Sequence, residues 1–267
     1  MRTGHLKTSP GQLVALSDSP AVWAWVGALA VGLILLPYLV GNYMLTLVVS
    51  AMAAVIGAVA LNMLTGQTGL ISLGQSGFLA VGAYANAILL SDYGLPVWLT
   101  LPAAGLTATG ISLIVGVPSL RLKGLYLAIT TLAFSFIISH IILYSEGLTH
   151  GPNGIFVKGA RLFGYDVQRG WPLYYLALAL TAGTILAALN LTRTRIGRAW
   201  IAIRDHDIAA RAMGIDLVRY KLLAFAVSSF FVGIAGALMS LQLRFVNVDV
   251  FGLILSIEAL AMIILGG

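Results

Sequence analysis

Long stretches without charge alternate with short polar segments along this chain. Residues 19–91 contain no Asp, Glu, Lys or Arg, and these 73 residues can form three membrane-spanning helices of about 20 residues each. The hydrophobic pattern places spans near 21–40, 43–62, 76–91, 97–117, 125–144, 172–191 and 221–242, with an eighth starting near Phe251. The chain is therefore predicted to be an all-α, polytopic membrane protein of about eight spans, with residues 21–267 forming one transmembrane domain.

Residues 61–78 (LNMLTGQTGLISLGQSGF) interrupt the apolar pattern between the second and third spans. The segment is rich in Gly, Ser, Thr and Gln, and it is too polar for a helix that faces lipid. It is therefore either a broken or re-entrant stretch that lines a translocation path, or a place where small residues let helices pack closely. The candidate path residues in it are Asn62, Gln67, Ser72 and Gln75.

Composition supports a membrane protein and excludes several kinds of chemistry. The chain is 60% hydrophobic and 9% charged, whereas soluble domains carry about 25% charged residues. Its net charge of +6 comes from basic residues beside apolar runs, which favours a role in membrane orientation over nucleic-acid binding. The chain has no cysteine, no Gly-Lys-Ser/Thr phosphate loop and no HExxH metal motif, so we expect no ATPase activity of its own and no metal or other cofactor.

The largest group of charges lies between the last two long apolar segments. Residues 193–221, which we call the island, contain seven of the fifteen Lys and Arg residues. Short basic loops remain on the cytoplasmic side of a membrane. With a cytoplasmic tail at residues 1–20, eleven basic residues fall inside and four (Lys158, Arg161, Arg169 and Arg244) fall outside. This asymmetry predicts that the loop at 192–220 is cytoplasmic and the loop at 145–171 is external.

The island carries the signals of a short helix. Asp205 can cap the N-terminus of a helix over residues 206–213, and Gly214 is well placed to end it. A charged loop helix on the cytoplasmic side suggests a docking surface for a cytoplasmic partner.

Two titratable residues lie in or near apolar segments. Glu258 is an acid within the last apolar segment, and a carboxylate in a membrane span is either functional or paired near the interface. On the functional interpretation, Glu258 is a fifth candidate path residue. His140 lies near the end of the fifth span, where a packed or interfacial histidine is the simpler interpretation.

Five motifs in order resemble one family of transport proteins. They are LNMLTGQTGLISLGQSGFLAVGAY (61–84), GLYLAITTLAF (124–134), GPNGI (151–155), TRIGRAWIAIRDHDIAARAMGIDLVRYKLLAF (194–225) and SIEALAMIILGG (256–267). From about residue 40 onward the chain is similar to the Liv M-type permeases of branched-chain amino acid ABC transporters. Chains of that family usually continue beyond the Leu-Gly-Gly found at residues 265–267, so the resemblance implies that further spans follow.

The resemblance implies an inner-membrane permease that works with other chains. These are a second, related permease, two cytoplasmic ATP-binding subunits and a periplasmic substrate-binding protein. Ala209, Ala210 and Gly214 match the core of the family's ATPase-coupling loop, with Asp205 and Asp207 beside it. The expected substrates are Leu, Ile and Val, moved by alternating access. A urea or short-chain amide permease shares these motifs, and a channel or an integral membrane enzyme remains the alternative from a different class.

Overall fold

The computed structural model, which describes residues 20–119, 122, 124–162, 165–168 and 170–266, consists almost entirely of helices. The chain divides into two compact units, residues 1–41 and residues 42–267. The described part of the first unit is the apolar helix α2 (Pro20–Leu39). The predicted cytoplasmic tail lies almost wholly outside the described residues. The rest of this section concerns the second unit.

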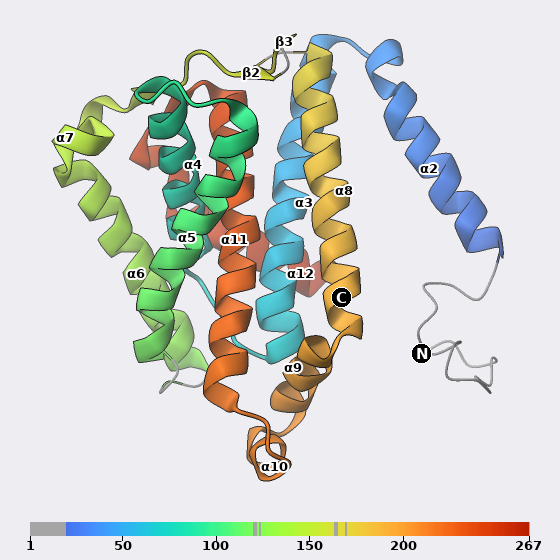
Figure 1. Cartoon of the computed structure of the whole chain (residues 1–267), viewed down its shortest axis with the longest axis vertical. Helices are drawn as coiled ribbons and strands as arrows, with labels where there is room; N and C mark the ends of the chain where they lie inside the picture. The colour runs from blue at the N-terminus through green and yellow to red at the C-terminus, as the bar shows by residue number, and fades with distance from the viewer. Residues whose placement is uncertain (1–19, 120–121, 123, 163–164, 169, 267) are drawn as a thin grey trace. The chain divides into compact units, whose positions relative to one another are not determined.

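Seven longer helices form the described part of the second unit, together with short elements at the two ends of the bundle (Figure 1). The longer helices are α3 (Asn42–Thr68), α4 (Gln75–Ser91), α5 (Val97–Ser119), α6 (Leu125–Tyr144), α8 (Gly170–Arg193), α11 (Leu217–Leu243) and α12 (Leu253–Gly266). One end carries α9 (Arg195–Asp205) and α10 (Asp207–Ala212). The short elements elsewhere are α7 (Glu146–Thr149), η1 (Gly151–Asn153), β1 (Ile155–Phe156), β2 (Arg161–Leu162), β3 (Tyr165–Asp166), β4 (Phe245–Val246) and η2 (Val248–Phe251).

Each of the eight predicted spans coincides with a helix, although the helix lengths differ from the prediction. Among the described residues, six helices are long and apolar enough to cross a membrane. The two remaining predicted spans correspond to α2 and to α4, which has only 17 residues. The second span was predicted to end near residue 62, but α3 continues to Thr68. The polytopic helical class is confirmed, and the count of eight is only roughly matched.

Helix α11 lies at the centre of the bundle because small residues let its backbone approach both α4 and α5. A Cβ atom added at Gly236 would collide with the Leu79 carbonyl oxygen of α4. One added at Gly233 would lie 2.7 Å from the Ala104 carbonyl oxygen of α5. Association of membrane helices depends on close packing of this kind, since lipid is as apolar as the side chains it would replace.

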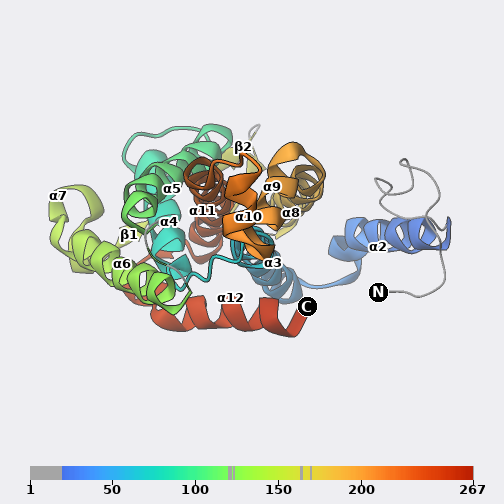
Figure 2. The same ribbon diagram turned by 90° about the horizontal axis from the view of Figure 1, so that it is seen from below.

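Helix α12 crosses the bundle at a steep angle to the other long helices. In the view along the bundle axis α3, α8 and α11 are seen end-on, whereas α12 is seen lengthwise (Figure 2). It packs against α3 and α4. The chain reaches α12 through β4, which pairs with β1 in an antiparallel hydrogen-bonded arrangement.

The predicted break between the second and third spans is confirmed. Helix α3 ends at Thr68, Gly69 has a positive φ of 71°, and α4 begins at Gln75. Protein covers part of the irregular backbone, because the Leu73 amide donates to the Thr131 hydroxyl of α6 at 2.9 Å. A Cβ at Gly74 would lie 2.8 Å from the Thr131 carbonyl oxygen. Close packing through small residues therefore applies to this segment, alongside the change of backbone direction.

Candidate functional site

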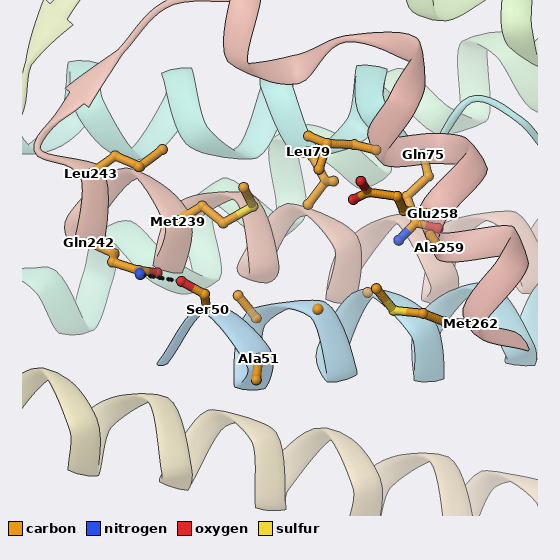
Figure 3. Close-up of a pocket in the computed structure, with 14 residues that line it drawn as sticks. Ser50, Ala51, Gln75, Leu79, Met239, Gln242, Leu243, Glu258, Ala259 and Met262 are labelled. Carbon is orange, nitrogen blue, oxygen red and sulfur yellow. Dashed lines mark hydrogen bonds between the residues drawn. The ribbon is translucent and has the colours of Figure 1, made fainter. Parts of the chain in front are cut away.

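A cavity of about 380 Å³ lies where α12 crosses α3, α4 and α11 (Figure 3). We call it the central cavity. Most of its wall is apolar, with four polar side chains. The lining residues that carry the argument are Ser50, Gly57, Gln75, Met239, Gln242 and Glu258. An apolar pocket with a few converging polar groups is the usual form of a small-molecule site.

Gln75 occupies the first position of α4, directly after the break, and its side chain is only 4% exposed. Its Oε1 atom is buried and has no hydrogen-bond partner. The side chain fits because Gly57 of α3 leaves room, since a Cβ there would lie 2.7 Å from Gln75 Nε2. A buried amide oxygen without a partner is costly, so this one is available to a ligand with a hydrogen-bond donor.

Glu258 extends from α12 into the same cavity. Its carboxylate points into the cavity toward Leu79 and lies beside Gln75 (Figure 3). It forms no ion pair among the residues that the structure describes. The fold thus brings together two of the predicted path residues that are 183 positions apart in the sequence. Together they place acceptor oxygens in a mostly apolar cavity.

Two further polar residues of the cavity were missed by sequence reasoning. Gln242 of α11 donates through Nε2 to the Thr46 carbonyl oxygen at 3.0 Å and to the Ser50 hydroxyl at 2.5 Å. A signal was available in α3, where Asn42, Thr46 and Ser50 follow one another at intervals of four residues. Side chains with this spacing lie on one face of a helix. Gln242 itself has no such signal, because it stands alone near the end of an apolar helix.

Two further hollows adjoin the central cavity along α3. One of about 490 Å³ lies toward the end with β1 and β4, and it shares Gln242 with the central cavity. The other, of about 170 Å³, lies toward the opposite end and shares Met262. Asn62 lines this second hollow and is exposed. Three adjoining hollows therefore follow α3 from Asn42 to Asn62.

The remaining two predicted path residues lie apart from the central cavity. Ser72 is 2% exposed and accepts a hydrogen bond from the Gly74 amide at 3.3 Å, within the break. Gln67 is half-buried near the end of α3, and its Oε1 atom has no partner. Neither residue lines the central cavity.

The island folds into two helices that are anchored to the bundle by Trp200. Helix α9 is capped by the Thr194 hydroxyl, which accepts from the Ile196 and Gly197 amides. Trp200 is fully buried beside Phe225 of α11, and its indole Nε1 donates to the Tyr220 carbonyl oxygen at 2.9 Å. The island is thus fixed to the start of α11.

Helix α10 protrudes from the end of the bundle, and it differs from the prediction at its start. His206 occupies the N-cap position, so the predicted cap by Asp205 is wrong. The reason is that Asp205 is the last residue of α9, where its carboxylate lies 3.4 Å from Arg204 Nε. The predicted stop at Gly214 is confirmed by its φ of 86°. The Gly214 and Ile215 amides donate to the Arg211 and Ala210 carbonyl oxygens, which completes a Schellman motif.

Large apolar side chains are exposed on α10 and at its C-cap. Ile208 is 78% exposed and Met213 is 85% exposed, and Ala209 is exposed as well. Ala210 faces inward and is 2% exposed, whereas Asp207 is half-buried. Asp207, Ala209 and Ala210 therefore lie on α10, with Gly214 just beyond its end, whereas Asp205 is the last residue of α9.

A direct contact joins the island to the break between α3 and α4. Arg204 Nη1 donates to the Gly66 carbonyl oxygen at 2.7 Å. A Cβ at Gly69 would lie 3.1 Å from Arg204 Cγ. A displacement of α9 and α10 would therefore act on the segment between α3 and α4 that leads to Gln75.

No group of three His, Asp or Glu side chains that could hold a metal ion occurs within the described residues. The polar groups of the three hollows are amides, hydroxyls, one carboxylate and one guanidinium. This set is suited to reversible binding of a small polar solute.

Comparison with known proteins identifies relatives along most of the chain. The family described as "Branched-chain amino acid transport system / permease component" matches residues 43–267. The high-affinity branched-chain amino acid transport system permease proteins LivM of Salmonella typhimurium and Escherichia coli are each 36% identical over 255 residues, which cover 86% of this chain and 60% of the relative. A probable branched-chain amino acid transport permease protein LivM of Methanocaldococcus jannaschii is 27% identical over 200 residues, covering 72% of this chain and 58% of the relative.

The chain spans about 60% of the length of these curated relatives. No solved structure matches it. The family match includes the break, the central cavity and the island. The chain therefore belongs to the permease-component family of branched-chain amino acid transport systems.

Proposed function

We propose that this chain is a membrane-spanning permease subunit of an ABC importer that moves Leu, Ile and Val across the bacterial inner membrane. Its partners are a second, related permease, two cytoplasmic ATP-binding subunits and a periplasmic substrate-binding protein. The N-terminus and the island face the cytoplasm, and β1 and β4 lie at the outer end. ATP hydrolysis in the partners opens the path alternately to each side.

The observation that carries the proposal is that Gln75 and Glu258 both line the central cavity. The buried Oε1 of Gln75 lacks a partner, and the Glu258 carboxylate points into the same space. An α-ammonium group offers three donors to such acceptors. Met239 and Leu255 contribute apolar wall for an aliphatic side chain. The chemistry of the cavity thus fits a branched-chain amino acid.

The second support comes from α10, which has the properties of a docking element. Ile208 and Met213 are exposed, and a partner subunit would bury them. Removing such apolar side chains from water favours binding. The Arg204 contact with Gly66 gives such a partner a mechanical connection to the break before Gln75. We infer that the ATP-binding subunit moves the first turn of α4 by this route.

Uptake of radiolabelled solutes tests the proposal. The chain is produced with its permease, ATPase and binding-protein partners in cells that lack their own leucine transport. We expect ATP-dependent accumulation of leucine that excess isoleucine or valine inhibits and urea does not. Accumulation of urea with no accumulation of leucine would instead identify a urea or amide permease and contradict the proposal.

A further inference from the structure

The hollow at the outer end of α3 contains a guanidinium that has no carboxylate partner in the described protein. We call this hollow the outer pocket. It has a volume of about 490 Å³, and its polar lining consists of Asn42, Tyr43, Thr46, Gln168, Gln242 and Arg244. Arg244 forms no ion pair among the described residues. A half-buried arginine without a counter-ion is costly, so it indicates a site for an anion.

The position of Arg244 is rigidly determined. It is the C-cap residue of α11 and has a positive φ of 61°, which is uncommon for a residue with a side chain. Its amide donates to the Ser240 carbonyl oxygen at 3.0 Å, and its own carbonyl oxygen accepts from the Val157 amide at 2.8 Å. The backbone is therefore held by both α11 and the segment that follows β1.

The guanidinium is also oriented, and part of it stays available. Arg244 Nη2 donates to the Gln168 carbonyl oxygen at 2.8 Å. A guanidinium has five N–H groups in a planar fork, so the remaining donors can bind a carboxylate. Fixing the side chain beforehand lowers the entropy cost of such binding.

The outer pocket adjoins the central cavity. Gln242 lines both, and its side-chain amide is held by Thr46 and Ser50 at the boundary. The outer pocket offers a cation, whereas the central cavity offers the acceptors of Gln75 and Glu258. The outer pocket thus suits the carboxylate of a zwitterion, and the central cavity suits its ammonium group.

We propose that the outer pocket is a receiving site for the carboxylate group of an amino acid, in which Arg244 makes the charged contact. This inference rests on the proposed function, because it names the first stop of the same substrate. The carboxylate binds Arg244 first, and the ammonium group then reaches Gln75 and Glu258 beyond Gln242. Binding at each stop is weak, since a transported solute has to leave again.

Charge-selective labelling of an introduced cysteine tests the outer pocket directly. The chain has no native cysteine, so Thr46→Cys places one thiol in this pocket. The assembled transporter, in right-side-out membrane vesicles, is treated with an anionic or a cationic methanethiosulfonate, and labelling is read as a mass shift of this chain. Each rate is divided by the rate of the same reagent with a free thiol. A unit charge a few ångströms away in a hydrated site should then raise the relative rate of the anionic reagent about five-fold and lower that of the cationic reagent by a similar factor.

Substitution of Arg244 provides the matched comparison. In the Arg244→Gln background the preference for the anionic reagent should disappear. In Arg244→Lys the preference for the anionic reagent should remain. Added carboxylates should protect the Thr46→Cys thiol from labelling less well than with Arg244, because an ammonium lacks the planar fork. An unchanged preference in Arg244→Gln would overturn the proposal. Circular dichroism and assembly with the partner chains show whether each variant is folded.

Protection by leucine analogues identifies the ligand group. Leucine and 4-methylpentanoate, which keeps only the carboxylate, should slow labelling of Thr46→Cys, whereas 3-methylbutylamine, which keeps only the amine, should not. Equal protection by the amine, or no protection by any carboxylate, would contradict the proposal. So would protection by the binding protein alone, since the pocket would then be a docking surface. Leucine uptake in the same vesicles tests the anion site and the proposed function separately. If the labelling preference depends on Arg244 but leucine is not taken up, the outer pocket is an anion site and the proposed function is refuted.

Discussion

Replacing Gln75 by Leu should stabilise the protein while it impairs transport. The Gln75 side chain is 4% exposed, and its Oε1 atom has no partner. A buried polar group in this state costs about 1–3 kcal/mol. Leucine is of similar size and apolar, so it removes that cost without leaving a large void. We expect the free energy of unfolding of Gln75→Leu to rise by about 1 kcal/mol.

The same substitution removes an acceptor from the proposed substrate site. A hydrogen bond to a charged group contributes about 1.5–3 kcal/mol. If the substrate ammonium uses Gln75, its loss should lower the kcat/KM of leucine uptake by about 10- to 100-fold. A residue that only packs the core would behave differently, because uptake would then follow stability.

The assay uses proteoliposomes that contain the assembled transporter and its binding protein. Initial rates of leucine uptake are compared with thermal unfolding of the same preparations. Gln67→Leu is the matched control, because Gln67 Oε1 is also without a partner but the residue does not line the central cavity. We expect Gln67→Leu to retain uptake. Normal uptake in Gln75→Leu, or an equal loss in both variants, would refute the reasoning.

Four further predictions address the island, the bundle and its orientation. Gly214→Val should abolish uptake but not membrane insertion, and Gly214→Asn should retain uptake, because φ is 86° there and Asn tolerates positive φ better than Val; normal uptake in Gly214→Val would contradict this. Arg204→Ala should preserve co-purification with the ATPase while lowering uptake, because it removes the bond to the Gly66 carbonyl oxygen; unchanged uptake would show that this contact carries no motion. Gly236→Val should lower the free energy of unfolding by about 3 kcal/mol through overpacking against α4, and unaltered thermal unfolding would contradict the packing described for α11. A cysteine at Asn153 should react with an impermeant reagent from the periplasmic side and one at His206 only from the cytoplasmic side, and the reverse pattern would overturn the proposed orientation.

Local chemistry made the helices and the break predictable. The absence of charge over residues 19–91 and the glycines of the break are properties of the sequence itself. The stop at Gly214 was likewise predictable, since glycine adopts positive φ readily. The predicted cap was wrong because Asp205 could either cap α10 or end α9. In the structure α9 includes Asp205, so His206 takes the N-cap position of α10.

The central cavity depended on packing that the sequence does not display. Glu258 could be recognised as an unusual acid, but its neighbour Gln75 is 183 positions away. Their approach follows from the steep crossing of α12, which hydrophobic periodicity cannot specify. Gln242 was missed for the same reason, because only the packing of α11 on α3 brings it to Ser50.

Accessibility of the central cavity to substrate is the most direct test of the account. Ala54→Cys places a single thiol in the cavity lining, and Phe136→Cys places one on an exposed face of α6 outside it. In the assembled transporter we expect an impermeant thiol reagent to label Ala54→Cys, leucine to slow that labelling, and Phe136→Cys to remain unlabelled because lipid covers it. Labelling of Ala54→Cys that leucine does not affect, or no labelling there in any state of the ATP cycle, would contradict the claim that the cavity is the substrate path.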